Sequence, residues 1–213
     1  MLNSKIAILA RPRSGSTSLY KLFKAHLEPI GFKAFYEPYN PRNYVDYYRS
    51  GFDFDYLDPL LKFDKIIIKT LFGCRQYPVK SIGNSEYAFG KWMLNFFDKV
   101  IVLDRRDKKL QAESLLANML SGIGWDIPKV YETDKIEKER LDREIASFQH
   151  FSRDLEKSAK DNNWPMFYYE DLFIDHNTGE IKRMFDYVGI EMNEDLVQDF
   201  IISDARKVRI DPH

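Results

Sequence analysis

Short apolar runs alternate with amphipathic helical patterns along the chain. The apolar runs that predict β-strands are residues 5–10, 31–36, 65–72, 99–104 and 164–170. Three of these runs are dense in Ile and Val and carry charged residues at their flanks; they are 5–10, 65–72 and 99–104. Continuous apolar strands are typical of a parallel sheet that is covered on both faces, and we expect such a sheet here.

The segments between these runs carry apolar residues at helical spacing. They predict helices over residues 19–30, 92–97, 108–123, 134–161, 178–188 and 194–203. Strands that alternate with helices indicate a doubly wound α/β fold. We therefore expect a P-loop-like three-layer α/β/α architecture with a central parallel sheet of about five strands, forming one domain over residues 1–213.

Two connections are long enough to carry binding surfaces or lids. Residues 38–60 are rich in tyrosine and proline, and residues 121–134 hold two glycines, a proline and Trp125. Connections of this length without their own helical or strand pattern are uncommon unless they serve function. Tyrosines close to residue 37 suit either stacking on a sugar ring or packing of a lid onto the core.

Charge and cysteine content limit the classes of binding partner and the compartment that we expect. The chain has 32 basic and 33 acidic residues, a net charge of -1, so no overall field attracts nucleic acid and any anion site must be local. No segment approaches the roughly 18 to 20 apolar residues of a membrane span. The single cysteine, Cys74, fits a reducing compartment. We expect a cytoplasmic protein with no nucleic-acid partner and no integral membrane segment.

A basic, glycine-containing turn follows the first predicted strand and leads directly into a helical pattern. Such an arrangement brings backbone N–H groups and the positive end of a helix dipole to one point, which favours an anion. Gly15 lets the backbone approach an oxygen closely, and Arg13 adds a forked cation. The candidate phosphate ligands are Arg13, Ser14, Gly15, Ser16 and Thr17. The alternative is a solvated turn with a Ser/Thr helix cap.

A second basic segment follows the strand predicted over residues 99–104. Arg106 and Ser114 are eight residues apart, one at the strand end and the other just inside the next helix. Open α/β sheets bind ligands at the carboxyl ends of their strands, so both side chains are placed to reach one phosphate. This spacing selects Arg106 over its neighbour Arg105.

Together these segments resemble the sulfotransferases that use 3′-phosphoadenosine-5′-phosphosulfate (PAPS). That family pairs an Arg/Lys-Ser-Gly-Ser/Thr-Thr/Ser loop for the 5′-phosphosulfate with an Arg and, eight residues later, a Ser for the 3′-phosphate. The sequences RSGST at 13–17 and RDKKLQAES at 106–114 match this pattern, in the style of bacterial glycan- and glycolipid-type members. A third match is YEDL at 169–172, which implies that Tyr169 lies near the adenine.

The chain also departs from the family pattern at two places. Cytosolic members carry an aromatic residue directly after the first loop to stack on adenine, whereas this chain has Ser18. Many members have a late basic loop with glycine that grips the 3′-phosphate. The nearest match here lacks the glycine and contains Arg206, Lys207 and Arg209, for which a solvated tail is the alternative.

The resemblance also implies a general base. Cytosolic members use a histidine after a Lys-Thr pair at a strand end, but here Lys69 and Thr70 are followed by Leu71. Glycan-type members use a glutamate after the second strand, and Glu37 stands there. Glu37 is therefore the expected base, and Arg13 and Lys69 the cations that neutralise charge on the leaving group. The alternatives are a surface carboxylate for Glu37 and a lysine with its ammonium in water for Lys69.

The sequence therefore predicts a sulfotransferase with PAPS as co-substrate, adenosine 3′,5′-bisphosphate (PAP) as product and no metal. The expected acceptor is a small molecule or a glycan, with a carbohydrate or glycolipid hydroxyl favoured over a phenol. One alternative is a P-loop kinase or NTPase that uses ATP and magnesium. Ser16 argues against this alternative, because ATP-binding loops have a lysine at that position. The other alternative is a catalytically inactive nucleotide-binding protein.

Overall fold

The computed structural model describes residues 4–38, 63–71, 96–120 and 136–205. The strands are β1 (Ser4–Ala10), β2 (Lys33–Tyr36), β3 (Lys65–Leu71), β4 (Lys99–Asp104) and β5 (Met166–Tyr168). The helices are α1 (Ser16–Leu27), α5 (Lys108–Leu120), α6 (Lys138–Asp161), α7 (Thr178–Val188) and α8 (Glu194–Ala205). The strands form one sheet in the order β2-β3-β1-β4-β5, and every pair is parallel. The predicted sheet of about five parallel strands is confirmed.

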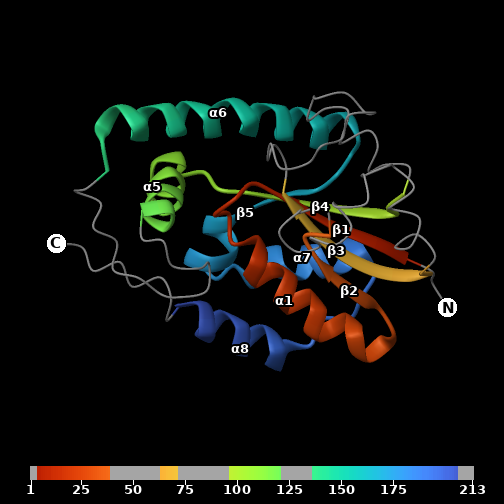
Figure 1. Cartoon of the computed structure of the whole chain (residues 1–213). Helices are drawn as coiled ribbons and strands as arrows, with labels where there is room; N and C mark the ends of the chain where they lie inside the picture. The colour runs from red at the N-terminus through yellow and green to blue at the C-terminus, as the bar shows by residue number, and fades with distance from the viewer. Residues whose placement is uncertain (1–3, 39–62, 72–95, 121–135, 206–213) are drawn as a thin grey trace, which may run out of the picture.

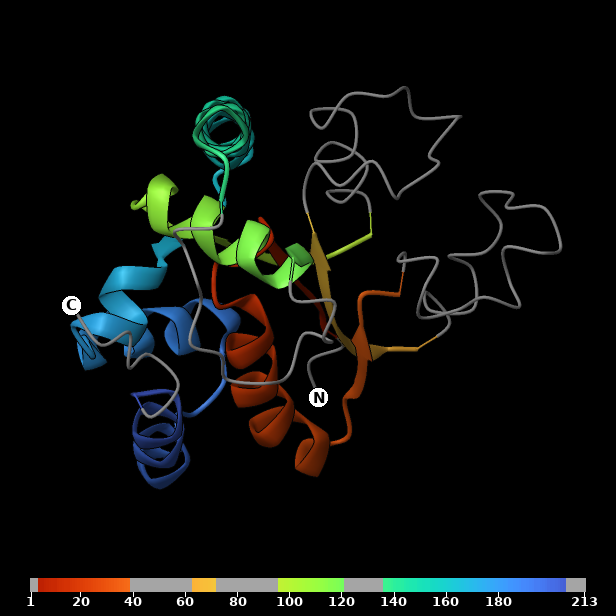
Figure 2. The ribbon, with the colours of Figure 1, turned by 60° about the vertical axis from the view of Figure 1, so that its left-hand side comes forward.

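The sheet is the middle of three layers. Figure 1 shows α1, α7 and α8 on one side of the sheet and α6 on the other, and Figure 2 shows α5 beneath α6. Alternate strand residues enter two separate hydrophobic clusters. The cluster on the α1 side includes Ile6, Ile8, Ile67, Ile101 and Leu103. The cluster on the α6 side includes Ala7, Leu9, Ile66, Ile68, Val100 and Val102. Burial on both faces explains why these strands are continuous apolar runs.

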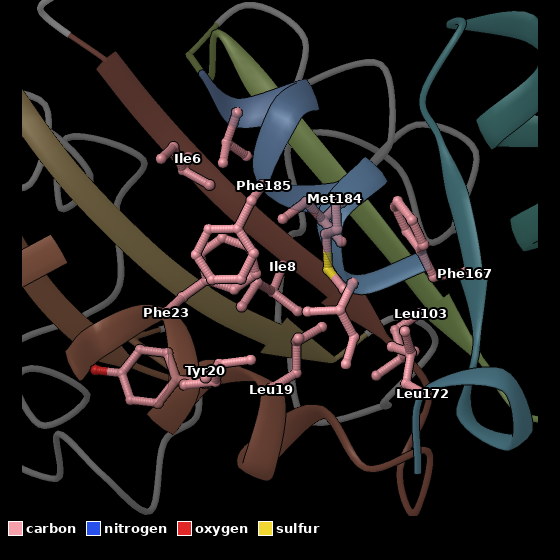
Figure 3. Packing of buried hydrophobic residues seen from close by; sticks show 14 of the residues in the cluster. Ile6, Ile8, Leu19, Tyr20, Phe23, Leu103, Phe167, Leu172, Met184 and Phe185 are labelled. Atoms are coloured by element: carbon pink, nitrogen blue, oxygen red, sulfur yellow. The ribbon is translucent and has the colours of Figure 1, made fainter. Parts of the chain in front are cut away.

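Aromatic side chains fill the larger of these clusters. Phe23 of α1 stacks on Phe185 of α7 with ring centroids 4.8 Å apart, and Figure 3 shows this pair beside Ile6 and Ile8 of β1. His26, on the next turn of α1, is also buried. Its Nδ1 lies 2.8 Å from the carbonyl oxygen of Leu22, and its Nε2 accepts the N–H of Asn193. This histidine has a structural role.

Two predicted strands are shorter than expected, each for a local reason. The run 31–36 begins as a strand only at Lys33, because Gly31 has a φ of 91° and ends the 3₁₀ turn Glu28–Ile30. The run 164–170 is a strand only over Met166–Tyr168, because the π-helical turn Glu170–Ile174 begins immediately after Tyr169. Most of the helix predicted over 92–97 and nearly all of both long connections lie outside the described residues.

The carboxyl ends of β1 and β4 form a topological switch point, where open α/β sheets bind ligands in a crevice. These strands are neighbours, but α1 leaves β1 on one face of the sheet whereas α5 and α6 follow β4 on the other. Connections that diverge in this way open a space above the two strand ends, where α/β proteins bind ligands. Both predicted phosphate segments follow these two strands. In the described part of the chain, no helix has the length and apolar character needed to cross a membrane.

Candidate functional site

The turn after β1 is held in the shape of an anion cradle. Arg13 and Gly15 both have left-handed backbone angles, with φ values of 64° and 81°. The Ser14 hydroxyl is buried and donates to the carbonyl oxygen of Arg11 at 2.7 Å, which closes the turn. Gly15 is the N-cap of α1, and it has no side chain that could satisfy the first N–H groups of the helix. The positive end of the helix dipole at this terminus favours an anion.

Gly15 is required at its position by two independent constraints. A Cβ there would lie 2.7 Å from ring atoms of both Tyr169 and Phe173. Its left-handed φ also disfavours any residue with a Cβ. These two aromatic rings, from the segment after β5, therefore form one wall of the cradle. The resemblance placed Tyr169 near the adenine, and the structure places its ring against the phosphate loop.

We expect Gly15→Ala to destabilise the protein by about 2–4 kcal/mol, from left-handed strain and from overpacking against the two rings. Gly189→Ala is the matched control, because Gly189 has a φ of 73° but nothing within 4 Å of the added Cβ. The control is expected to cost about 1–2 kcal/mol, the strain alone. Urea denaturation measures both values. Equal losses in the two variants would contradict close packing of the rings on the loop.

Helix α5 reaches across to this loop. The Gln111 side chain donates to the carbonyl oxygen of Pro12 at 2.7 Å. One turn later, the Ser114 hydroxyl accepts a hydrogen bond from Arg13 Nε at 2.8 Å. The two motifs that the sequence separates by about a hundred residues are thus in direct contact. Arg13 and Ser114, proposed for two different phosphates, lie within one site.

Arg106 lies in a different environment. Its Nη1 and Nη2 donate to the two carboxylate oxygens of Asp171 at 2.5 Å and 2.7 Å, and its guanidinium lies 4.1 Å from the centroid of the Tyr168 ring. The hydrogen bond to Arg106 is the main reason why the pKa of Asp171 is lowered and that of Arg106 raised. Glu170 accepts the backbone N–H groups of Arg106 and Asp107. Glu170 and Asp171 therefore bind this loop and fix its position.

Glu37 and Lys69 form a buried ion pair where β2 and β3 end. The Lys69 ammonium contacts a carboxylate oxygen of Glu37, and the side chains are only 3% and 7% exposed respectively. The backbone reinforces the pair, because the Glu37 N–H donates to the Lys69 carbonyl at 2.8 Å. Both solvent-exposed alternatives, a surface carboxylate and a lysine with its ammonium in water, are wrong. Burying two charges is costly, and removing one partner would leave the other buried without its counter-charge.

Tyr36 joins this ion pair to the phosphate loop. Its hydroxyl lies 2.9 Å from the Thr17 hydroxyl, at the start of α1. The Lys69 ammonium lies 4.6 Å from the centroid of the Tyr36 ring, a cation–π distance. In the sequence, Tyr36 is one of several tyrosines close to Glu37, and nothing there gives it a separate role. The signal that could have identified it is the alternation of β2, which directs residue 36 to the same face as Lys69, its partner in the sheet.

The remaining predicted site residues are placed only in part. Ser16 is buried and Ser18 half-buried on the first turn of α1. Arg206 and Lys207 lie outside the described residues, and so do the tyrosines that follow Glu37 in the long connection. Within the described ranges, no group of three or more His, Cys, Asp or Glu side chains is arranged to hold a metal ion.

Comparison with known proteins identifies a shared fold. No protein-family model matches the sequence, and no curated protein is significantly similar to it. The structure is similar to the crystal structure of the mouse sulfotransferase SULT7A1 complexed with PAP, with a TM-score of 0.61 and 14% sequence identity. The match covers 95% of this chain and 64% of the mouse chain, so this chain spans just under two thirds of its length. The chain therefore has the α/β fold of a sulfotransferase.

Proposed function

We propose that this protein is a PAPS-dependent sulfotransferase whose single domain covers residues 1–213 and whose acceptor is a hydroxyl of a carbohydrate or glycolipid. The observation that carries the proposal is the hydrogen bond from Arg13 to Ser114. It supports a single site assembled from two motifs, one suited to a 5′-phosphosulfate and one to a 3′-phosphate. The fold shared with a PAP-complexed sulfotransferase also supports PAPS as donor.

The donor's 5′ end fits the loop between β1 and α1. Backbone N–H groups at the start of α1 and the Arg13 guanidinium supply positive potential for the phosphosulfate, and the hydroxyls of Ser14, Ser16 and Thr17 stand along the same turn. Ser114 and a cation of the basic pair after β4 supply the second anchor. A ligand with anionic groups at both 5′ and 3′ positions engages both anchors.

The chemistry is an in-line transfer of the sulfuryl group. The acceptor oxygen forms a bond to sulfur while the bond from sulfur to the bridging phosphate oxygen breaks, and PAP leaves with the electron pair. Glu37 takes the acceptor's proton as attack proceeds. Lys69 and Arg13 neutralise the negative charge that develops on the leaving oxygen. The buried Glu37–Lys69 pair supports these roles, because acid–base and cationic groups then stand side by side at one strand edge.

Transfer from radiolabelled PAPS to a panel of hydroxyl acceptors tests the proposal. The panel contains mono- and disaccharides, glycolipids and simple phenols, and the measured product is the labelled acceptor together with PAP. We expect labelling of a sugar hydroxyl and little or none of the phenols. Labelling of phenols alone would contradict the proposed acceptor class, and PAP release without a labelled acceptor would mean hydrolysis of the donor.

A further inference from the structure

The two adjacent arginines after β4 lie in opposite environments. The Arg106 side chain is 51% exposed, and Asp171 occupies both of its terminal nitrogens in a forked ion pair. A bidentate guanidinium–carboxylate pair is among the strongest side-chain interactions. A phosphate that approached the same edge of Arg106 would have to displace a carboxylate that already meets it.

Arg105, by contrast, is largely buried and incompletely bonded. Its side chain is 12% exposed, and its Nε is buried with no hydrogen-bond partner among the described residues. Glu170 Oε1 lies 3.9 Å from this Nε, which is beyond hydrogen-bond distance. That carboxylate is already used by the backbone N–H groups of the following two residues. A buried cationic donor in this state gains substantially from an anion that completes its hydrogen bonds.

Arg105 and the loop after β1 lie against the same aromatic ring, whereas Arg106 lies over a different one. The Arg105 guanidinium lies 4.5 Å from the centroid of the Tyr169 ring, and the same ring is in close contact with Gly15. Arg106 instead lies over Tyr168, the preceding residue in the chain. Tyr169 therefore lies next to both Arg105 and the loop after β1, which places these two parts of the candidate site close together.

From this placement we infer that Arg105 binds the 3′-phosphate of the nucleotide, and that Arg106 is a structural clamp with Asp171. The inference rests on the proposed function and reverses the choice made by the eight-residue spacing. The loop at 13–17 is matched to the 5′-phosphosulfate. The 3′-phosphate of the same ligand then binds the buried guanidinium of Arg105, beside Tyr169.

The test compares the affinities of PAP and 5′-AMP, which differ only by the 3′-phosphate, and it needs no acceptor. Arg105→Gln is the main variant, because glutamine keeps much of the packing over Tyr169, and Arg105→Ala is the second. We expect both to weaken PAP binding by about ten- to hundredfold, the usual loss for a charged hydrogen bond, and to change AMP binding less than threefold. Isothermal titration calorimetry measures both dissociation constants.

Arg106→Gln and Asp171→Asn are the matched controls. We expect each to leave the ratio of PAP to AMP affinity within threefold of the parent chain, to lower the midpoint of thermal unfolding, and to be non-additive when combined. Loss of the PAP preference in Arg106→Gln but not in Arg105→Gln would overturn the inference. Equal loss in both variants would also overturn it, because the phosphate would then be shared. If the parent chain itself binds PAP no better than AMP, the proposed function fails.

Discussion

Glu37→Gln is expected to lower sulfuryl transfer at least a hundredfold while PAP affinity stays within about threefold of the parent chain. General base catalysis contributes about 10² to 10⁴ in rate, and glutamine cannot take a proton from the acceptor. Its amide oxygen still accepts a hydrogen bond from the Lys69 ammonium, so the site keeps its shape. Initial rates with labelled PAPS and calorimetric PAP titrations give the two quantities.

A carboxylate just after α1 provides the control for this variant. Glu28 is exposed and pairs with Lys24 one turn earlier, so Glu28→Gln removes the same charge away from the candidate site. This control is expected to leave rate and affinity unchanged. If Glu37→Gln retained the parent rate, the base would have to be another group. A parallel loss of PAP binding would assign Glu37 to the architecture of the site.

Lys69→Met is expected to destabilise the protein by about 3–5 kcal/mol, because it leaves the Glu37 carboxylate buried without its cation. The double variant Glu37→Gln/Lys69→Met is expected to recover most of this loss, since neither partner is then charged. Urea denaturation of the two single variants and the double variant forms a complete cycle. It separates the interaction between the two side chains from their individual effects.

The surface pair Lys24–Glu28 supplies the comparison for this cycle. Its side chains are 45% and 48% exposed, so Lys24→Met should change stability by no more than about 1 kcal/mol. A double variant at 37 and 69 that was no more stable than Lys69→Met alone would contradict a direct charge pair. A loss in Lys69→Met as small as in Lys24→Met would contradict burial of the pair.

The sheet could be predicted from the sequence because its three central strands, β1, β3 and β4, are buried on both faces. Runs such as 65–72 are largely apolar along their whole length and too short for a typical helix, which favours a buried strand. The ends of the elements were less predictable. Tyr169 continues the aromatic run of β5, but the chain then turns into a π-helical segment whose carboxylates bind the loop after β4. Tertiary contacts, and not local propensity, set that boundary.

The sequence proposes the candidate site residues but not their contacts. The cradle glycine and the cations are proposed from residue type and spacing along the chain. Spacing cannot show the environment of each side chain, and this is why it selected Arg106 although Arg106 is paired with Asp171. Nor could the burial of Glu37 and Lys69 be foreseen. It depends on the parallel register that sets Tyr36 beside Lys69.

Ligand-dependent thermal stability tests the central claim most directly, namely that the crevice is built for a 3′,5′-bisphosphate and not for ATP. A ligand that binds only the folded state adds RT ln(1 + [L]/Kd), about 2.7 kcal/mol at a hundredfold excess over Kd. We predict that PAP raises the midpoint of thermal unfolding, whereas ATP with magnesium at the same concentration does not. Stabilisation by ATP with magnesium but not by PAP would contradict the account.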